Sequence, residues 1–362
     1  MVSPRPDAAQ RARSPEDPLP RRWVALAVLL AVASACAGDG HGGDDVTGTG
    51  GSTVTATMPV TVLGTTRVPA PSTTAASSSV VSLAAELSAV EAGIRVAGVT
   101  DAELATLGRR QQLAYRAVNQ HPEWWPRLAD LVEPVAATPL AFHVAARQAQ
   151  IDHDLAATTA DTTAPDTTAL GANAVPDATG PPTTVPAPTL PAWTIVEPLP
   201  IDVLRGYYAE AEAATGVPWQ YLAAINFQET RMGRVVGVST AGAVGPMQFL
   251  PATWAACCTG DPTVPRDAIM GAARYLAQLG APGDMQAALY GYNPNSAYVG
   301  AVTAYAQNMI ADERAYDGYH GWEVFYSTPM GTVRLPVGYS ATTPIDLASY
   351  VRDRPEDLLP PG

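Results

Sequence analysis

Hydrophobic positions recur at helical spacing in two separate stretches of this 362-residue chain. In the first, residues 81–155, the side chains of Leu83, Leu87, Val90 and Ile94 lie three or four residues apart, which is typical of one face of a helix. Further apolar positions follow after a proline-containing break. This stretch therefore predicts a small helical unit.

The same unit contains a helix start signal and a pair of tryptophans. Thr100 and Glu103 have the spacing of a capping box, in which each side chain bonds the backbone N–H of the other residue. Trp124 and Trp125 stand at the break between helices. Aromatic residues at a helix junction are more often interior than ligand-binding, so we expect both to pack in the core.

The second stretch, residues 193–340, predicts the main folded domain. Pro218 stands where a helix begins and Gly233 just past its end, so Glu229 falls on the last turn. A glycine-rich loop or short hairpin should follow. Further helices are expected at about 248–256, 268–279, 284–290 and 296–310, with a β-hairpin within 325–338. The predicted fold class is mainly α with a small β-hairpin.

Low-complexity sequence surrounds these two stretches. Residues 37–80 and 156–192 are rich in Gly, Thr, Ser, Ala and Pro, and such segments cannot bury enough apolar surface to fold. We expect both to be disordered linkers, the first acting as a tether. Residues 341–362 are expected to form a C-terminal tail.

The N-terminus has the pattern of an export signal. A pair of arginines precedes the apolar run 23–35, which is too short to span a bilayer. The run ends in small residues followed by Cys36. Residues 1–36 therefore resemble a bacterial lipoprotein signal peptide, with Cys36 as the lipidated residue; an ordinary signal peptide is the alternative. We expect an exported protein anchored to the outer face of the cell membrane.

Charge and composition exclude several kinds of function. The formal net charge of −13 argues against nucleic-acid binding, which needs basic side chains to neutralise phosphates. The five histidines lack metal-ligand spacing, and no glycine-rich loop carries a lysine for phosphate. We expect neither a metal nor a cofactor. Cys257 and Cys258 are adjacent, and the tight geometry of a bond between neighbours favours two reduced side chains.

Three local motifs carry the candidate chemistry. Residues 228–233 read Gln-Glu-Thr-Arg-Met-Gly, residues 242–249 read Gly-Ala-Val-Gly-Pro-Met-Gln-Phe, and residues 290–293 read Tyr-Gly-Tyr-Asn. Their order and spacing resemble the lytic transglycosylases of the goose-lysozyme-like superfamily, which carry Glu-Ser, Gly-Leu-Met-Gln and Ala-Tyr-Asn motifs. Residues 233–251 resemble one branch of that family almost throughout. The resemblance covers about 195–340 and implies a lysozyme-like domain.

The resemblance implies a substrate, a reaction and a set of site residues. The substrate is the glycan strand of peptidoglycan, cut at the β-1,4 bond between N-acetylmuramic acid and N-acetylglucosamine. Glu229 would act first as acid and then as base, so that the 6-hydroxyl closes on C1 and leaves a 1,6-anhydro end. The implied substrate-binding residues are Thr230, Met247, Gln248, Tyr292, Asn293 and Tyr298. Thr230, Pro246 and Gly291 depart from the family motifs without removing a reactive group.

The residues around Glu229 support this chemistry independently of the family resemblance. A carboxylic acid protonates a leaving oxygen near neutral pH only if its pKa is raised, and burial is the usual cause. Ile225, Phe227 and Met232 give Glu229 apolar neighbours. Most glutamates near a helix end are simply exposed to solvent. The three motifs together nevertheless favour a catalytic role for Glu229.

A second acid is not evident, and this bears on the mechanism. Glycosidases generally use two carboxylates. Asp261 and Asp267 follow the second motif, but we interpret them as a loop residue and a helix cap. One acid suits a transglycosylase. The alternatives are a hydrolytic muramidase of the same fold and a catalytically inert, wall-binding lipoprotein. No sequence feature identifies a protein partner.

Overall fold

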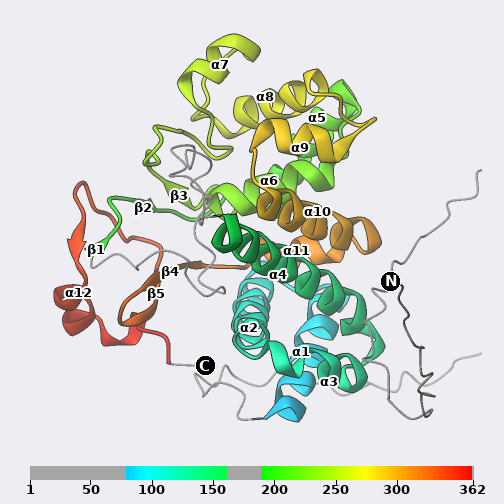
Figure 1. The fold of residues 1–362 in the computed structure, drawn as a ribbon, viewed down its shortest axis with the longest axis vertical. Coiled ribbons are helices and arrows are strands. Elements are labelled where there is room, and N and C mark those ends of the chain that lie inside the picture. The colour runs from blue at the N-terminus through cyan, green and yellow to red at the C-terminus, as the bar shows by residue number, and fades with distance from the viewer. Residues whose placement is uncertain (1–78, 161–188, 361–362) are drawn as a thin grey trace, which may run out of the picture. The chain divides into compact units, whose positions relative to one another are not determined.

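The computed structural model describes residues 79–160 and 189–360, and these are mainly helical, as predicted (Figure 1). None of the described helices combines the length and apolar composition that crossing a bilayer requires. Cys36, the expected signal peptide and most of both expected linkers lie outside the described residues. The helices are α1 (Val80–Ile94), α2 (Asp101–Gln120), α3 (Trp125–Leu131), α4 (Pro134–Ala160), α5 (Ile201–Thr215), α6 (Trp219–Thr230), α7 (Pro251–Cys257), α8 (Pro265–Gln278), α9 (Met285–Tyr292), α10 (Ser296–Ala311), α11 (Arg314–His320) and α12 (Leu347–Asp353).

Local sequence explains most of the helix ends. The capping box between Thr100 and Glu103 is formed at the start of α2, as predicted. Pro218 is the N-cap residue of α6, and Asp284 caps α9 with its side chain. The role expected for Asp267 was wrong. Helix α8 begins earlier, at a proline, so Asp267 lies inside its first turn and accepts a hydrogen bond from the Asp261 N–H instead.

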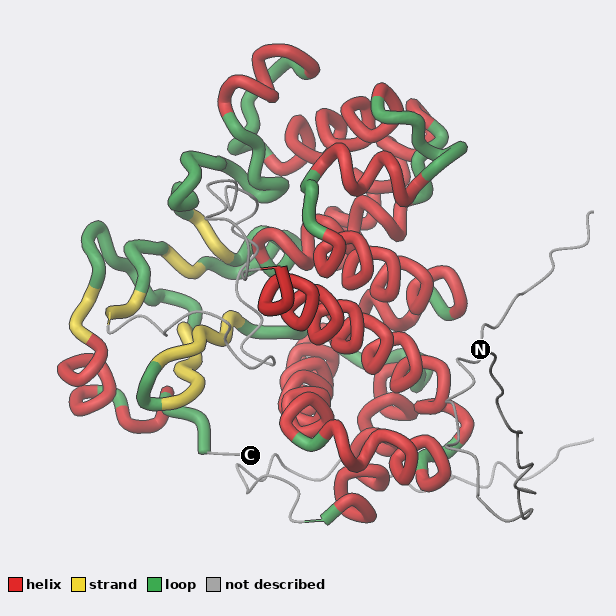
Figure 2. The backbone as a smooth tube through the Cα atoms, viewed as in Figure 1, coloured by secondary structure: helices red, strands yellow, loops and turns green. Residues whose placement is uncertain are grey.

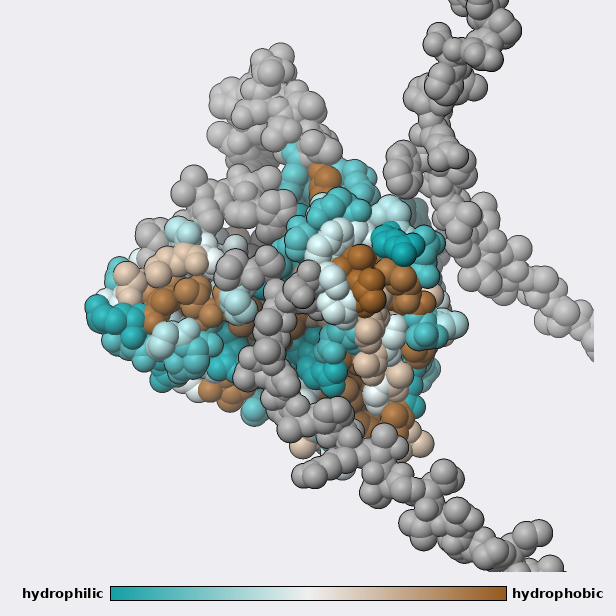
Figure 3. Space-filling view, turned by 90° about the horizontal axis from the view of Figure 1, so that it is seen from below, coloured by the Kyte–Doolittle hydropathy of each residue, from teal (hydrophilic) through white to brown (hydrophobic). Residues whose placement is uncertain are grey.

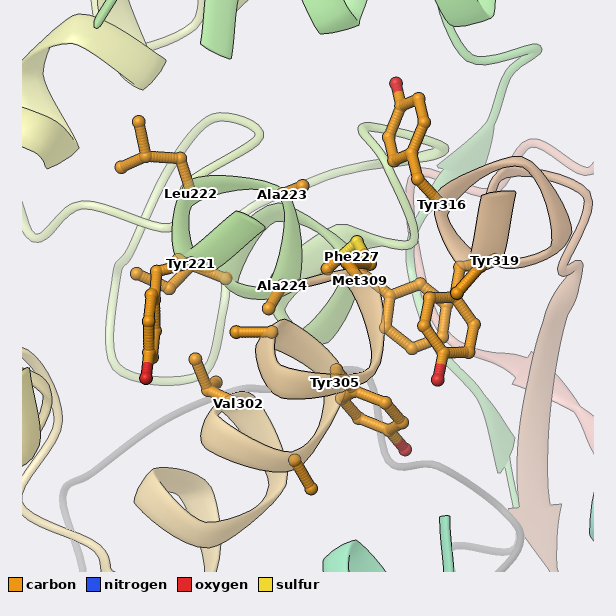
Figure 4. Packing of buried hydrophobic residues seen from close by; sticks show 14 of the residues in the cluster. Tyr221, Leu222, Ala223, Ala224, Phe227, Val302, Tyr305, Met309, Tyr316 and Tyr319 are labelled. Atoms are coloured by element: carbon orange, nitrogen blue, oxygen red, sulfur yellow. The ribbon is translucent and has the colours of Figure 1, made fainter. Parts of the chain in front are cut away.

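Helix α6 is the centre of the main core. Ten of its twelve residues are buried, so it is enclosed on nearly all sides and has no wide solvent-exposed face. The Phe227 ring stacks on Tyr319 and packs edge to face with Tyr305, with ring centroids 5.0 Å apart in both pairs (Figure 4). It also packs edge to face with Trp322, at 5.2 Å. Helices α5, α8, α10 and α11 all contact α6. The buried position of α6 later determines the environment of Glu229.

The helices of the 79–160 region share this core with the later helices. Helix α4 runs beside α10 and makes the most extensive helix pair of the described residues (Figure 1). Trp322 donates a hydrogen bond of 2.8 Å to Gln111 of α2. Arg95 joins the buried Glu91 carboxylate to Asp312, at 2.6 and 2.5 Å. The predicted helical unit therefore packs directly on the second stretch.

The tryptophan pair behaves as expected for interior residues. Trp124 and Trp125 are partly buried against the main core. The Trp125 indole N–H donates to the Val118 carbonyl at 2.8 Å, and the Trp124 ring stacks on His121. Trp125 thus uses both the polar and the apolar part of its side chain, while Trp124 is held by ring stacking.

A second, smaller core lies among short strands (Figure 2). The predicted hairpin is present as β4 (Val324–Thr328) and β5 (Gly331–Leu335). Further short strands and one more helix surround this hairpin. Within the expected C-terminal tail 341–362, the chain forms strand β6 (Ile345–Asp346) and helix α12. Figure 3 shows hydrophobic residues at the surface of this part, where Met330 and Val337 are about half exposed. The remaining strands are β1 (Thr189–Leu190), β2 (Thr194–Ile195), β3 (Val235–Val236) and β6 (Ile345–Asp346), paired as β1 with β6 and β2 with β3.

The state expected for the adjacent cysteines was wrong. Cys257 and Cys258 are joined by a vicinal disulfide. Helix α7 ends at Cys257, and Cys258 has extended backbone angles, so the regular helical arrangement of neighbouring side chains stops between them. That change of backbone conformation is not evident from the residue types alone.

The close approach of α4 and α10 yields a stability prediction. A Cβ atom at Gly300 would lie 2.4 Å from the Cβ of Ala149, which is far inside contact distance. Gly300→Ala should therefore destabilise the protein by about 1–3 kcal/mol, although alanine is normally the better helix former. Urea unfolding of purified protein measures the change, and adding Ala149→Gly should recover much of it.

A matched control lies on α5. Gly206 is an exposed helical glycine, and a Cβ atom added there would meet nothing within 4 Å. Gly206→Ala should therefore stabilise the protein by about 0.5–1 kcal/mol, because alanine favours the helical backbone. Equal effects of the two glycine substitutions would contradict the close contact between α4 and α10.

Candidate active site

Glu229 lies on the last turn of α6 with only 4% of its surface exposed. Burial raises the pKa of its carboxyl group from the usual 4.5 to about 8, because the apolar surroundings disfavour the charged form. The only opposing influence comes from Tyr298, whose hydroxyl lowers this pKa. At neutral pH the carboxyl group is therefore largely protonated.

Two tyrosines from later helices meet Glu229. Burial raises the pKa of both Tyr292 and Tyr298 well above 10, and the charge of Glu229 adds to each shift. The Tyr298 hydroxyl acts on the carboxyl group of Glu229, yet among the described residues it has no partner with full hydrogen-bond geometry. The first and third motifs, together with the start of α10, are thereby brought to one place.

The second motif forms a tight loop beside these residues. Val244 and Phe249 exchange two backbone hydrogen bonds of 2.9 and 3.0 Å. Gly245 and Gln248 both have positive φ, and a Cβ at Gly245 would lie 1.8 Å from the Pro262 carbonyl oxygen. The glycine is required by both its backbone angle and this close approach. Backbone strain at a non-glycine such as Gln248 is characteristic of functional sites.

A buried polar network fixes the loop to α6. Asn226, fully buried, accepts a hydrogen bond from the Tyr208 hydroxyl at 2.6 Å and donates to the Pro246 carbonyl at 2.8 Å. The Thr230 hydroxyl also donates to that carbonyl, at 2.7 Å. The sequence reasoning missed Asn226 and Tyr208 as site residues. The available signal was an asparagine within the otherwise apolar run 221–227.

The residues expected to bind substrate do not all lie where a substrate could reach them. Thr230 and Met247 are fully buried, so they support the loop from inside. The Tyr292 hydroxyl donates to the Met247 carbonyl at 2.6 Å, and the Gln248 side chain donates to the Gly245 carbonyl at 2.9 Å. The first bond joins the third motif to the second, and the other closes the turn within the second motif.

Asn293 is the polar side chain best placed to meet a ligand. It follows α9 as its C-cap residue and is 5% exposed. Its Oδ1 atom is buried without a hydrogen-bond partner among the described residues. Such an atom costs free energy unless a donor is supplied, so it is suited to accept an N–H or O–H from a bound molecule.

No second carboxylate contributes to the pKa shift of Glu229. Within the described residues, no cluster of three or more His, Cys, Asp or Glu side chains is arranged to hold a metal ion. The Arg231 guanidinium, buried two residues after Glu229, lies over the Phe227 ring at 4.5 Å and donates to the Phe227 carbonyl. The chemistry of the site therefore centres on one protonated carboxyl group among tyrosines and amides.

Parts of this chain are similar to known proteins. Residues 206–313 match the family model described as the Transglycosylase SLT domain, so this part of the chain is an SLT domain. An 82-residue segment is 35% identical to the membrane-bound lytic murein transglycosylase F of Thiobacillus denitrificans (strain ATCC 25259 / T1). That segment is 23% of this chain and 17% of the relative, so the chain matches only a small part of the relative's length. None of the solved structures is significantly similar to this chain.

The raised pKa predicts how stability depends on pH. Because the pKa of Glu229 is higher in the folded protein than in the unfolded chain, the folded protein is most stable below pH 4.5. Its free energy of unfolding then falls as the pH rises toward 8. Glu229→Gln removes this loss. The variant should match the parent near pH 4 and be about 3 kcal/mol more stable at pH 7, as measured by urea unfolding across pH 4–9.

Glu210 provides the matched control. Its pKa is lowered by the hydrogen bond from Arg266, so its contribution to stability is present at neutral pH and lost as the pH falls. Glu210→Gln should thus alter the pH profile in the opposite sense and only slightly, since the pair is exposed. A constant offset between Glu229→Gln and the parent would contradict the raised pKa.

Proposed function

We propose that this protein is a peptidoglycan lytic transglycosylase and that Glu229 is its catalytic residue. The observation that carries the proposal is the burial of Glu229 on the innermost helix of an SLT domain, which raises its pKa to about 8. A group that is protonated at neutral pH serves as a general acid, and its conjugate base is unusually strong. The relative from Thiobacillus denitrificans is named as a lytic murein transglycosylase, which agrees with this assignment.

In the proposed first step, Glu229 gives its proton to the oxygen that links N-acetylmuramic acid to N-acetylglucosamine. The bond from C1 to that oxygen breaks, and the shared electron pair leaves with the N-acetylglucosamine. The 2-acetamido group stabilises the positive charge that develops at C1. Asn293, with its unpartnered Oδ1, is suited to hold an amide N–H of the substrate.

In the second step, the Glu229 carboxylate removes the proton of the 6-hydroxyl group, and that oxygen bonds to C1. The product carries a 1,6-anhydro end, Glu229 is protonated again, and no water is consumed. Burial favours both steps, because it makes the protonated form available and the ionised form basic. Gln248, Tyr292 and Tyr298 are proposed to line the substrate site, while Thr230 and Met247 hold its loop in place.

Product analysis tests this proposal. Purified full-length protein should release glycan fragments with 1,6-anhydro ends from isolated peptidoglycan, and Glu229→Gln should reduce the rate by about 10²–10⁴-fold, the contribution typical of a general acid or base. Mass spectrometry of the products distinguishes anhydro from reducing ends. Glu210→Gln, at an exposed ion pair, is the control and should retain full activity.

Other outcomes separate the alternatives. Reducing ends would identify a muramidase that delivers water to C1. Peptidoglycan that is bound but left uncut, with parent and Glu229→Gln behaving alike, would identify an inert wall-binding protein.

We also propose that the protein is exported and held at the outer face of the cell membrane by lipid on Cys36, with the segment 37–80 as a tether. The proposal rests on the small residues before Cys36 and the short apolar run 23–35. Acyl chains bind a bilayer with about 0.8 kcal/mol per buried CH₂ group. Cys36→Ser should therefore abolish labelling by radioactive palmitate in cells and move the protein out of the membrane fraction. Unlabelled parent protein in the soluble fraction would contradict the anchor.

A further inference from the structure

An open groove lies where α4 packs against the SLT domain, with a volume of about 720 Å³. Its walls come from α4, α9 and α10, and the first of these lies outside the segment that matches the SLT family. Neither Glu229 nor Gln248 nor Asn293 lines it. The groove is therefore formed jointly by helices inside and outside the SLT segment, and none of the proposed active-site residues lines it.

The contact between α4 and α10 builds this groove. Gly300 lets the two helices approach closely at Ala149. At the far end of α4, His153 contacts the start of α10 through hydrogen bonds to Ser296 at 3.0 Å and to Asn295 at 3.4 Å. The α4 wall is thus held in place by packing and by polar contacts.

The lining contains aromatic rings but no charged side chain, in a protein with a formal net charge of −13. Phe142 comes from α4, and Tyr290 comes from α9 with 54% of its surface exposed. An exposed tyrosine beside a groove offers a flat apolar face with a polar edge, a combination enriched at binding sites. The absence of charge from the lining disfavours ionic ligands, because nothing in the groove would compensate their desolvation.

Polar groups in the groove are few and uncharged. The Thr303 hydroxyl oxygen is buried and has no hydrogen-bond partner among the described residues. Gln286 and Gln307 each add a side-chain amide, and the NH₂ group of Gln307 also donates to the Tyr221 hydroxyl at 3.1 Å. A ligand that satisfies these groups needs both hydrogen-bond donors and acceptors without charge.

We propose that this groove is an accessory binding site for an uncharged, N-acetylated saccharide unit of a glycan strand. The apolar face of a sugar ring suits Tyr290 and Phe142, while hydroxyl and acetamido groups suit Thr303 and the glutamine amides. The volume lies within the usual range for ligand sites, and an open groove lets a polymer pass through. The choice of an N-acetylated sugar rests on the proposed function.

Binding without turnover tests the site. The probe is chitotetraose, an uncharged tetramer of N-acetylglucosamine, added to the full chain carrying Glu229→Gln and followed by calorimetry and NMR. Two classes of site are expected. Adding Tyr290→Ala should weaken one of them by up to about tenfold, the scale of one aromatic contact, and leave the other unchanged. Thr303→Val should weaken the same class.

Ile310→Ala is the matched control, because Ile310 is also on α10, is 45% exposed and does not line the groove. It should leave both classes of site unaltered. If neither Tyr290→Ala nor Thr303→Val changes the affinity for chitotetraose, the proposed accessory site is wrong. Thermal unfolding of each variant identifies any loss of binding that comes from misfolding, since an exposed tyrosine should be replaceable without loss of stability.

Catalysis gives a second, independent measurement. With Glu229 intact, Thr303→Val should slow release of fragments from insoluble peptidoglycan several-fold but leave cleavage of short soluble glycans unchanged. Equal rates on both substrates would count against an accessory role. Failure of the proposed function appears differently, as an absence of cleavage by the parent protein, and the binding experiment remains interpretable in that case.

Discussion

The desolvation of one carboxyl group is the constraint on which the site depends. Helix α6 is buried on nearly all sides, so the glutamate on its last turn has almost no contact with water. A shift of the pKa from 4.5 to about 8 corresponds to about 5 kcal/mol between the two protonation states. The surrounding helices must supply this free energy by packing. The proposed catalytic group is therefore maintained at the expense of stability at pH values above about 4.5.

The structure compensates this constraint with hydrogen bonds that hold the neighbouring loop. Asn226 and Thr230 both bond the Pro246 carbonyl, while Tyr292 bonds the Met247 carbonyl from the other side. The loop therefore has little freedom, although Gln248 has an unfavourable backbone angle. The helices before the SLT domain extend the same framework, because Trp322 packs on Phe227 and bonds Gln111.

Much of the local structure was predictable from short-range signals. The capping box at Thr100, the helix start at Pro218 and the hairpin within 325–338 follow from rules that depend on a few neighbouring residues. Two other local predictions failed, because the residue types alone did not give the exact helix boundary or the backbone angles beyond it. Asp267 is not a cap because α8 begins at Pro265, and the cysteine pair is bonded because the backbone turns extended at Cys258.

The sequence by itself determined the mainly helical fold class, the position of Glu229 on a helix end and the three motifs of an SLT domain, because periodicity and spacing are local properties. Only the tertiary structure decided which side chains meet. It brought Tyr298 to Glu229 and buried Thr230 and Met247 as supports. It also packed α4 against α10, which creates the groove. These outcomes depend on contacts between residues far apart in the chain, and burial, which sets the pKa of Glu229, is a property of all those contacts together.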